Sequence, residues 1–345
     1  MLALVPASPP APAAWQDDYR AARLTTAELL AHVGLNVADL PYGLAPAPDF
    51  ALKVPPHFRS LIRRGDPHDP LLLQVLARAD ELVDDPARLA DPLDEQNFTP
   101  SRGILRKYGS RALLIAASSC AIHCRYCFRR HTDYGAMVLT PADQAAAVAA
   151  LKADPAIIEV ILSGGDPLTL SDDRLAGLLT ALDAIPHLAA IRIHTRTLTS
   201  VPARVTPALT ALLAGLGKPV VIVTHTNHAE ELDTVVADAL GRLREAGVTL
   251  LNQSVLLRGV NDTAASIGAH ALRLFACGVL PYYMHLMDPV AGAGHFDVGL
   301  AEALALEQAL RDTLPGYLVP RFVREVPGRL AKTPIWQLWP GAISV

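Results

Sequence analysis

The chain of 345 residues has few cysteines, few aromatic residues and little concentration of charge. Four cysteines are too few for a disulfide framework in a chain of this length. Beyond the proline-broken N-terminus, no uncharged apolar run approaches the ~18 residues that a membrane span requires. The 30 basic residues are scattered among 34 acidic ones, whereas nucleic-acid binding usually needs a concentrated cationic face. These features argue against a disulfide-rich secreted protein, a membrane protein and a nucleic-acid-binding protein.

The N-terminal stretch Met1–Gln16 is uncharged but is not typical of a signal peptide. It lacks a basic beginning, and four prolines interrupt it. We therefore expect a cytoplasmic protein. Hydrophobic residues make up 51% of the chain and charged residues 19%, so there is ample material for a packed core.

The chain contains two regions of different pattern. The first hundred residues are rich in proline and aspartate and contain helix-like segments such as Thr26–Val33 and Pro70–Val83. From about Arg111, short β-rich runs alternate with helix-periodic segments, and Leu318–Val323 is a possible extra strand. The six β-rich runs are Ala112–Ala116, Ile157–Leu162, Ala190–Thr195, Val220–Thr224, Thr249–Ser254 and Tyr282–Leu286.

This alternation predicts an α/β fold with parallel strands and crossover helices. A whole or partial barrel is the favoured interpretation, and an open doubly wound sheet is the alternative, because periodicity alone does not separate the two. In both folds the functional groups lie in the loops that follow the strands.

Three of the four cysteines follow the first β-rich run of the barrel. Cys120, Cys124 and Cys127 have the spacing C-x3-C-x2-C, and thiolates at this spacing can converge on one inorganic centre. A structural zinc site usually has four ligands, whereas three thiolates suit a [4Fe–4S] cluster with one exposed iron. Zinc with His123 as fourth ligand and three buried free thiols are the alternatives. Cys277 lies in a helical pattern and is expected to be a buried core residue.

The motif C-x3-C-x-aromatic-C after the first strand of a βα repeat resembles the signature of the radical S-adenosylmethionine (SAM) superfamily. The resemblance implies a partial (β/α)6 barrel in which Cys120, Cys124 and Cys127 hold a [4Fe–4S] cluster and SAM chelates the fourth iron. Tyr126 matches the aromatic position near the adenine of SAM, although it also suits an ordinary core position.

The surrounding segments resemble the lysine 2,3-aminomutase family, which moves an amino group from C2 to C3 of L-lysine with the help of pyridoxal phosphate (PLP). The matching segments are Cys124–Arg130, Ser163–Leu168, Thr224–His228, Asn252–Asp262, Pro281–Tyr283 and Val323–Pro334. They occur in one order over roughly residues 90 to 334. Together they predict an isomerase.

Within that family the chain looks most like the bacterial branch that prepares β-lysine for elongation factor P. The segments Phe50–Val54, Asp69–Leu76 and Asp91–Gln96 resemble its N-terminal region. This branch implies a β-lysine ligase and elongation factor P as downstream partners, a flavodoxin or ferredoxin as electron donor, and a possible homo-oligomer. A free L-lysine 2,3-aminomutase that makes β-lysine as a metabolite is the alternative.

The resemblance also implies an organisation in three parts. Residues 1–105 would form a helical N-terminal extension, residues 106–319 the partial barrel, and residues 320–345 a C-terminal segment with the PLP lysine. The zinc-binding cysteine cluster near the C-terminus of free-lysine enzymes is expected to be absent, since no cysteine follows Cys277.

The family likeness assigns cofactor roles to several residues. Lys332 matches the lysine that carries PLP, and Tyr108 and Arg111 match positions around that cofactor, with Arg111 a candidate phosphate partner. Lys107 stands where free-lysine enzymes have arginine, so a bidentate phosphate contact is in doubt there. The residues that match contacts to SAM are Gly164, Gly165, His225 and Gln253.

Three charged residues match contacts to the substrate. Arg129 corresponds to the arginine that pairs with the carboxylate of lysine. Asp288 and Glu325 correspond to two acids that hold its ε-ammonium group, and Glu325 replaces an aspartate of the free-lysine branch. Taken alone, each of the three would be interpreted as a solvated surface charge.

Overall fold

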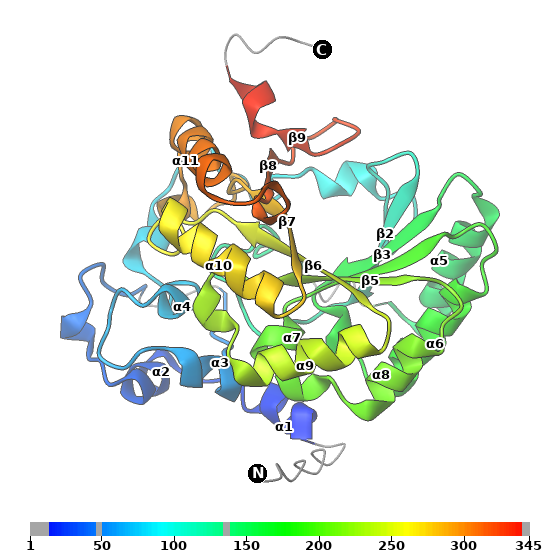
Figure 1. Cartoon of the computed structure of the whole chain (residues 1–345), viewed down its shortest axis with the longest axis horizontal. Coiled ribbons are helices and arrows are strands. Elements are labelled where there is room, and N and C mark those ends of the chain that lie inside the picture. Colours follow the sequence, from blue (N-terminus) through cyan, green and yellow to red (C-terminus); the bar gives the residue numbers. More distant parts are fainter. Residues whose placement is uncertain (1–13, 46–49, 134–138, 340–345) are drawn as a thin grey trace.

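A computed structural model describes residues 14–45, 50–133 and 139–339 of the chain. Its centre is one sheet whose nine strands are hydrogen-bonded in sequence order (Figure 1). Seven of them run parallel: β2 (Arg111–Ala117), β3 (Glu159–Gly164), β4 (Ala190–Thr195), β5 (Val220–His225), β6 (Thr249–Val255), β7 (Leu280–His285) and β8 (Arg321–Arg324). The short strands β1 (Ile104–Leu105) and β9 (Thr333–Pro334) pair antiparallel at the two edges.

This strand order decides between the two α/β folds that the sequence left open. A doubly wound sheet reverses its strand order at a switch point, whereas here every strand pairs with the next strand along the chain. The fold is therefore a partial barrel, and its sheet is open. The possible extra strand is confirmed as β8, although it begins three residues later than expected.

The longer crossover helices lie in chain order around the outer face of the sheet (Figure 1). They are α5 (Pro141–Ala153), α6 (Asp172–Asp183), α8 (Pro207–Ala214), α9 (Thr234–Glu245), α10 (Ala264–Ala276) and α11 (Leu300–Thr313). The short helix α7 (Thr197–Ser200), which follows β4, lies beside α9. Side-chain caps begin most of the longer ones. Thr140, for example, accepts from the Asp143 backbone while Asp143 accepts from the Thr140 backbone.

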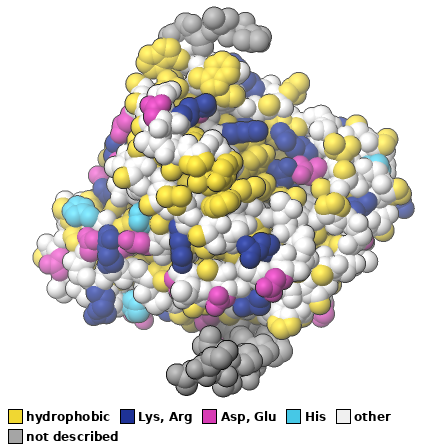
Figure 2. Space-filling view, viewed as in Figure 1, with side chains coloured by type: hydrophobic (Ala, Val, Ile, Leu, Met, Phe, Trp, Pro, Cys, Tyr) yellow, Lys and Arg dark blue, Asp and Glu magenta, His cyan; other side chains and the backbone are white. Residues whose placement is uncertain are grey.

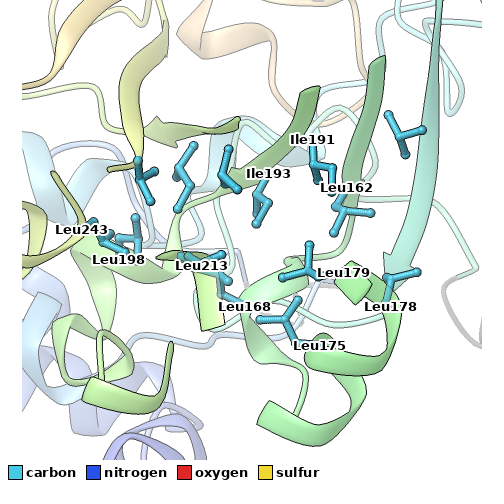
Figure 3. Close-up of a cluster of buried hydrophobic side chains, with 14 of the residues drawn as sticks. Leu162, Leu168, Leu175, Leu178, Leu179, Ile191, Ile193, Leu198, Leu213 and Leu243 are labelled. Atoms are coloured by element: carbon cyan, nitrogen blue, oxygen red, sulfur yellow. The ribbon is translucent and has the colours of Figure 1, made fainter. Parts of the chain in front are cut away.

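The main hydrophobic core fills the space between the sheet and these helices. Ile191 and Ile193 of β4 face Leu175 and Leu179 of α6, and Leu243 of α9 lies at the other end of the same layer (Figure 3). All five are fully buried. This core holds the sheet rigid below the loops that carry the functional groups.

The N-terminal region contains short helices joined by extended segments. They are α1 (Ala14–Arg20), α2 (Thr26–Val33), α3 (Pro56–Leu61) and α4 (Pro70–Leu73), with short 3-10 turns at Val37–Asp39, Ala79–Leu82 and Glu95–Phe98. Their buried side chains form a second core that includes Ile122 of the cysteine loop. The N-terminal region is thus packed directly against the predicted cofactor site.

The helix expected over Pro70–Val83 is wrong in its extent, because α4 ends at Leu73. Two backbone carbonyls beyond its end bond to other segments instead. The carbonyl of Gln74 accepts from the Arg125 backbone at 2.9 Å, and that of Ala77 accepts from Ala45 at 3.4 Å. At Gln74 and Ala77, tertiary hydrogen bonds therefore take the place of helical ones.

In the described part of the chain, no helix is both long and apolar enough to cross a bilayer. Most of the stretch Met1–Gln16, interpreted above as no signal peptide, lies outside the described residues. On the face drawn in Figure 2, basic side chains are interspersed with acidic and apolar ones.

Candidate active site

Two adjoining cavities lie among the strands and the loops that follow them. The central cavity has a volume of about 200 Å³, and the cysteine cavity, named for the three cysteines in its wall, has one of about 150 Å³. Several residues line both cavities: Phe128, Arg129, Ser163, His194, His225, Gln253, Val255 and Asp288. The two cavities thus form one continuous site.

The site collects the predicted residues from distant parts of the chain. The central cavity is lined by Tyr108, Arg111, Arg129, His225, Gln253, Asp288, Glu325 and Lys332. The cysteine cavity is lined by Cys120, Cys124, Tyr126, Cys127, Gly164 and Gly165, together with Arg129, His225, Gln253 and Asp288. Every site residue named from the sequence therefore lies on the wall of one or both cavities.

The three cysteines lie in the loop after β2. Burial raises the pKa of Cys120 well above its usual value and that of Cys127 to about 11, and the neighbouring cysteines add to both shifts. Three thiols crowded into a cavity are costly to ionise alone, but bound iron stabilises their thiolates. The set therefore fits an iron–sulfur cluster with three protein ligands.

The zinc alternative is less compatible with this geometry. The ring of His123 stacks on Phe50 at 4.6 Å, and its Nδ1 is 2.7 Å from the carbonyl oxygen of Ala51. Among the described residues, no three His, Cys, Asp or Glu side chains are close enough to hold a single metal ion. Cys277 lies at the end of α10 in the main core, as expected.

The two glycines after β3 are needed for close packing. A Cβ atom on Gly164 would lie 2.6 Å from the carbonyl oxygen of Ala117, and one on Gly165 would lie 2.5 Å from the backbone of Ser119. Gly164 also has a φ of 108°, which side chains disfavour. Glycine is thus required at both positions because the loops after β2 and β3 approach each other closely. The backbone groups of Gly164 and Gly165 also line the cysteine cavity.

Tyr126 joins the cysteine loop to β5. Its ring stacks on His225 at 5.7 Å, and its hydroxyl lies 3.1 Å from His225 Nε2. Burial lowers the pKa of His225 to about 3, so its imidazole is neutral. Gln253 pairs with His225 across β5 and β6. The positions expected to contact SAM are therefore neighbours.

Lys332 and Glu325 form an ion pair on the wall of the central cavity. Lys332 Nζ donates to Glu325 Oε2 at 2.8 Å, and the Tyr108 hydroxyl donates to Glu325 Oε1 at 2.7 Å. The guanidinium of Arg111 lies 4.1 Å from the centre of the Tyr108 ring. Both carboxylate oxygens of Glu325 are thus engaged by residues predicted to surround PLP.

Arg129 is engaged by a residue that the sequence did not single out. Its Nε and Nη2 donate to the two oxygens of Glu95, each at 2.7 Å, and its Nη1 donates to the carbonyl of Gly164 at 3.2 Å. Both side chains are nearly buried. This bidentate pair fixes the plane of the guanidinium beside the cavity.

Asp288 differs from the other acids of the site because its Oδ1 is buried and has no hydrogen-bond partner in the structure. Burial raises its pKa to about 7, and the nearby charge of Lys332 opposes that shift. A buried carboxylate without a partner is costly. The position therefore favours a cationic ligand.

Several residues of the site had no assigned role in the sequence. Glu95, Arg196, His194 and His285 line the cavities. Arg196 and His194 had a detectable signal, since they are polar residues at the end of an apolar β-rich run. Glu95 had none, because its partner Arg129 is 34 residues away along the chain.

Comparison with known proteins agrees with this arrangement. Residues 114–266 match the model of the radical SAM superfamily. The L-lysine 2,3-aminomutase of Escherichia coli is 46% identical over 83% of this chain and 83% of its own length. The L-lysine 2,3-aminomutase of Haemophilus influenzae is 43% identical over 88% of this chain and 90% of its own length.

A radical SAM methyltransferase structure from Sphaerobacter thermophilus aligns over 64% of this chain and 68% of its own, at 18% identity. Its TM-score of 0.42 is too low to bear on the fold. On its sequence similarity, the chain belongs to the L-lysine 2,3-aminomutase family of the radical SAM superfamily.

Proposed function

We propose that this protein is a PLP-dependent radical SAM isomerase that converts L-lysine to β-lysine. The observation that carries the proposal is the convergence of three cysteines and the Lys332–Glu325 pair on one continuous site. They come from loops about two hundred residues apart in the sequence. The identity of 46% to a named L-lysine 2,3-aminomutase supports the same activity.

The residues present fit the three cofactors of the family. Cys120, Cys124 and Cys127 would hold the [4Fe–4S] cluster, Lys332 would attach PLP, and the neutral pair His225 and Gln253 would contact SAM. When bound, these groups supply the electron that cleaves SAM to a 5′-deoxyadenosyl radical and the carrier on which the amino group of lysine migrates from C2 to C3.

The protein's own groups position the reactants and limit access of water. The Tyr108 hydroxyl and Lys332 both donate to Glu325, so Glu325 orients the attaching amine toward the cavity. The apolar residues Leu93, Leu105, Leu113, Ile161 and Val255 line the central cavity between the charged groups. An apolar wall of this kind excludes water that would quench a radical.

Lysine carries a charge at each end, and the site offers an opposite charge for each. Asp288 provides a carboxylate with an unpartnered oxygen for the ε-ammonium group. Arg129 would orient the substrate carboxylate, a contact made beside its ion pair with Glu95. Glu325 would contribute to the ammonium site while it also holds Lys332.

The cellular role is proposed from family likeness. We propose that the β-lysine is used by a β-lysine ligase that modifies elongation factor P, that a flavodoxin or ferredoxin donates the electron, and that the protein works in the cytoplasm. A homo-oligomer is also proposed. Product that accumulates free in cells, and no loss of modified elongation factor P on deletion of the gene, would favour the metabolic alternative.

Anaerobic purification with analysis of iron, sulfide and PLP, followed by incubation with SAM, a reductant and L-lysine, tests the proposal. We expect about four irons per chain and formation of β-lysine. Alanine at Cys120, Cys124 or Cys127 should remove the brown colour and SAM cleavage, whereas the matched variant Cys277→Ala should keep both. Stoichiometric zinc in a colourless protein, or cluster loss in a folded Cys277→Ala variant, would contradict the assignment.

A further inference from the structure

Arg196 is a buried cation that contacts the sulfur of one predicted cluster ligand. It follows β4 directly, and its backbone nitrogen donates to Asp166 Oδ2 at 2.7 Å. Its Nη1 donates to Cys124 Sγ at 2.7 Å and to the Tyr126 hydroxyl at 2.6 Å. The residue is 6% exposed. Hydrogen bonds of both the main chain and the side chain of Arg196 thus hold its guanidinium at Cys124.

The opposite edge of the guanidinium meets a buried carboxylate. Arg196 Nη2 donates to Gln74 Oε1 at 2.7 Å and lies 3.1 Å from Glu231 Oε2. Glu231 is fully buried and also accepts from the backbone nitrogens of Asn227 and His228. The charge of Arg196 is therefore partly compensated on one side, while the other side is directed at sulfur.

Two physical effects of this contact act in the same direction. Hydrogen bonds to the sulfurs of an iron–sulfur centre, and positive charge near it, stabilise the reduced state, which carries one more negative charge. Burial strengthens both effects, because charges interact more strongly away from water. An arginine that served only to hold the fold together would need neither a hydrogen bond to the sulfur nor a positive charge beside the cluster.

We propose that Arg196 sets the reduction potential of the cluster held by Cys124, and that Glu231 moderates its charge. The inference rests on the proposed function, because it requires the cluster. Arg196 is a positioning residue: it acts through the cysteine sulfur and takes no part in bond breaking. The affected step is the uptake of one electron from the external one-electron donor by the oxidised cluster.

Redox titrations of the reconstituted protein, followed by electron paramagnetic resonance, test this role. In Arg196→Gln we expect full iron and sulfide content but about tenfold less reduced cluster at a fixed potential, which is a shift of about 59 mV to more negative values for one electron. Arg196→Lys keeps the positive charge, so its reduction potential should shift less than that of Arg196→Gln. Glu231→Gln removes the moderating charge and should shift the potential in the positive direction.

Arg204→Gln is the matched control. Arg204 is also a fully buried arginine, but it forms an ion pair with Asp172 and donates to the carbonyl of Leu168. Its replacement should leave the potential unchanged. The inference is overturned if Arg196→Gln has the parent's potential or if Arg204→Gln shifts equally. If Arg196→Gln loses its cluster, the test depends on Glu231→Gln. A reduction potential that is unchanged or more negative in Glu231→Gln then overturns the inference. A parent without any cluster refutes the proposed function itself.

Discussion

At the scale of single residues, the two acids expected to hold the substrate's ammonium group are in different environments. Glu325 is buried, which raises its pKa, but Lys332 and Tyr108 lower that pKa below its usual value overall. Asp288 has an unpartnered oxygen, and burial raises its pKa to about 7. At neutral pH Glu325 is therefore ionised, whereas Asp288 is divided between its two forms.

This difference predicts the pH dependence of lysine turnover. An ammonium group binds the ionised form of Asp288, and that form is lost as pH falls through about 7. We expect kcat/KM for lysine to rise with pH across this range and then level off, and the rise to disappear in Asp288→Asn. A pH profile of initial rates checks this. An unchanged rise in Asp288→Asn would assign the titration to another group.

Replacement of each acid should have a distinct effect. Loss of one partner of a desolvated charge pair typically costs about 2–5 kcal/mol, so Asp288→Asn and Glu325→Gln should each reduce lysine turnover by roughly 30-fold or more, since ~1.4 kcal/mol is tenfold. Asp288→Asn should keep the affinity for PLP. Glu325→Gln should also weaken PLP attachment, because Glu325 holds Lys332. Titration of each variant with PLP, together with lysine kinetics, distinguishes the effect of Asp288→Asn from that of Glu325→Gln.

Equal lysine turnover in either variant and the parent would contradict a lysine site at these acids. Preference of the parent for an amino acid without an ε-ammonium group would do the same. In both cases a PLP-dependent radical isomerase with another substrate would remain.

At the scale of elements, the cysteine loop is anchored to the N-terminal region by a buried group of charges. Glu81 accepts from Arg125 Nε at 2.8 Å, from Arg125 Nη2, and from Arg130 Nη2 at 2.6 Å. Arg125 Nη1 also donates to the carbonyl of Phe50 at 2.6 Å. These bonds join the loop between β2 and α5 to two segments of the N-terminal region.

Glu81→Gln should destabilise the protein strongly, because it leaves two buried arginines without their counter-charge. We expect a loss of roughly 3–5 kcal/mol in the free energy of unfolding, measured by urea denaturation of the apo-protein. Glu302→Gln is the matched control: Glu302 also pairs with an arginine through both oxygens, but the pair is exposed. Its replacement should have little effect. Equal stability of the two variants would show that the buried group does not anchor the loop.

At the scale of the whole molecule, the last strands of the sheet bring the C-terminal segment back to the site. β8 pairs with β7, β9 pairs with β8, and Lys332 immediately precedes β9. Lys332 therefore reaches the cavity only when this edge of the open sheet is assembled. A ligand that bonds to Lys332 would tie that edge to the rest of the barrel.

PLP should accordingly stabilise the whole fold. At a hundred times its Kd, a ligand that binds only the folded state adds about 2.7 kcal/mol to the free energy of unfolding, visible as a rise in melting temperature. Lys332→Ala should lose most of this rise and keep the cluster, while Lys218→Ala, a lysine bonded to the carbonyl of Leu188, should behave like the parent. Borohydride reduction and peptide mapping should place the pyridoxyl group on Lys332. Label on another lysine, such as Lys107, would contradict the assignment.

The division into residues 1–105, 106–319 and 320–345 stays a prediction. The structure gives these regions shared elements: β1, within the first region, pairs with β2, and β8, within the last, pairs with β7. Limited proteolysis that releases stable fragments near residues 105 and 319 would support the division.

The local sequence by itself determined much of the fold. The β-rich run Ala190–Thr195 and the helix over Thr26–Val33 lie where the sequence placed them, because apolar periodicity and caps act within a few residues. The spacing of Cys120, Cys124 and Cys127 likewise indicated a cluster site without any tertiary information. The prediction of a partial barrel also came from the sequence, through the family likeness.

Tertiary structure decided the features that depend on distant partners. The periodicity of the strands did not separate the barrel from the doubly wound sheet; the strand order, which is a set of long-range pairings, did so. The pairing of Arg129 with Glu95 and the contact of Arg196 with Cys124 join residues 34 and 72 positions apart. No local pattern reports such contacts, because burial and charge compensation are set by the assembled core. The substrate proposal depends on the unpartnered oxygen of Asp288. The sequence could not indicate this feature, because the burial of Asp288 depends on segments that are distant along the chain.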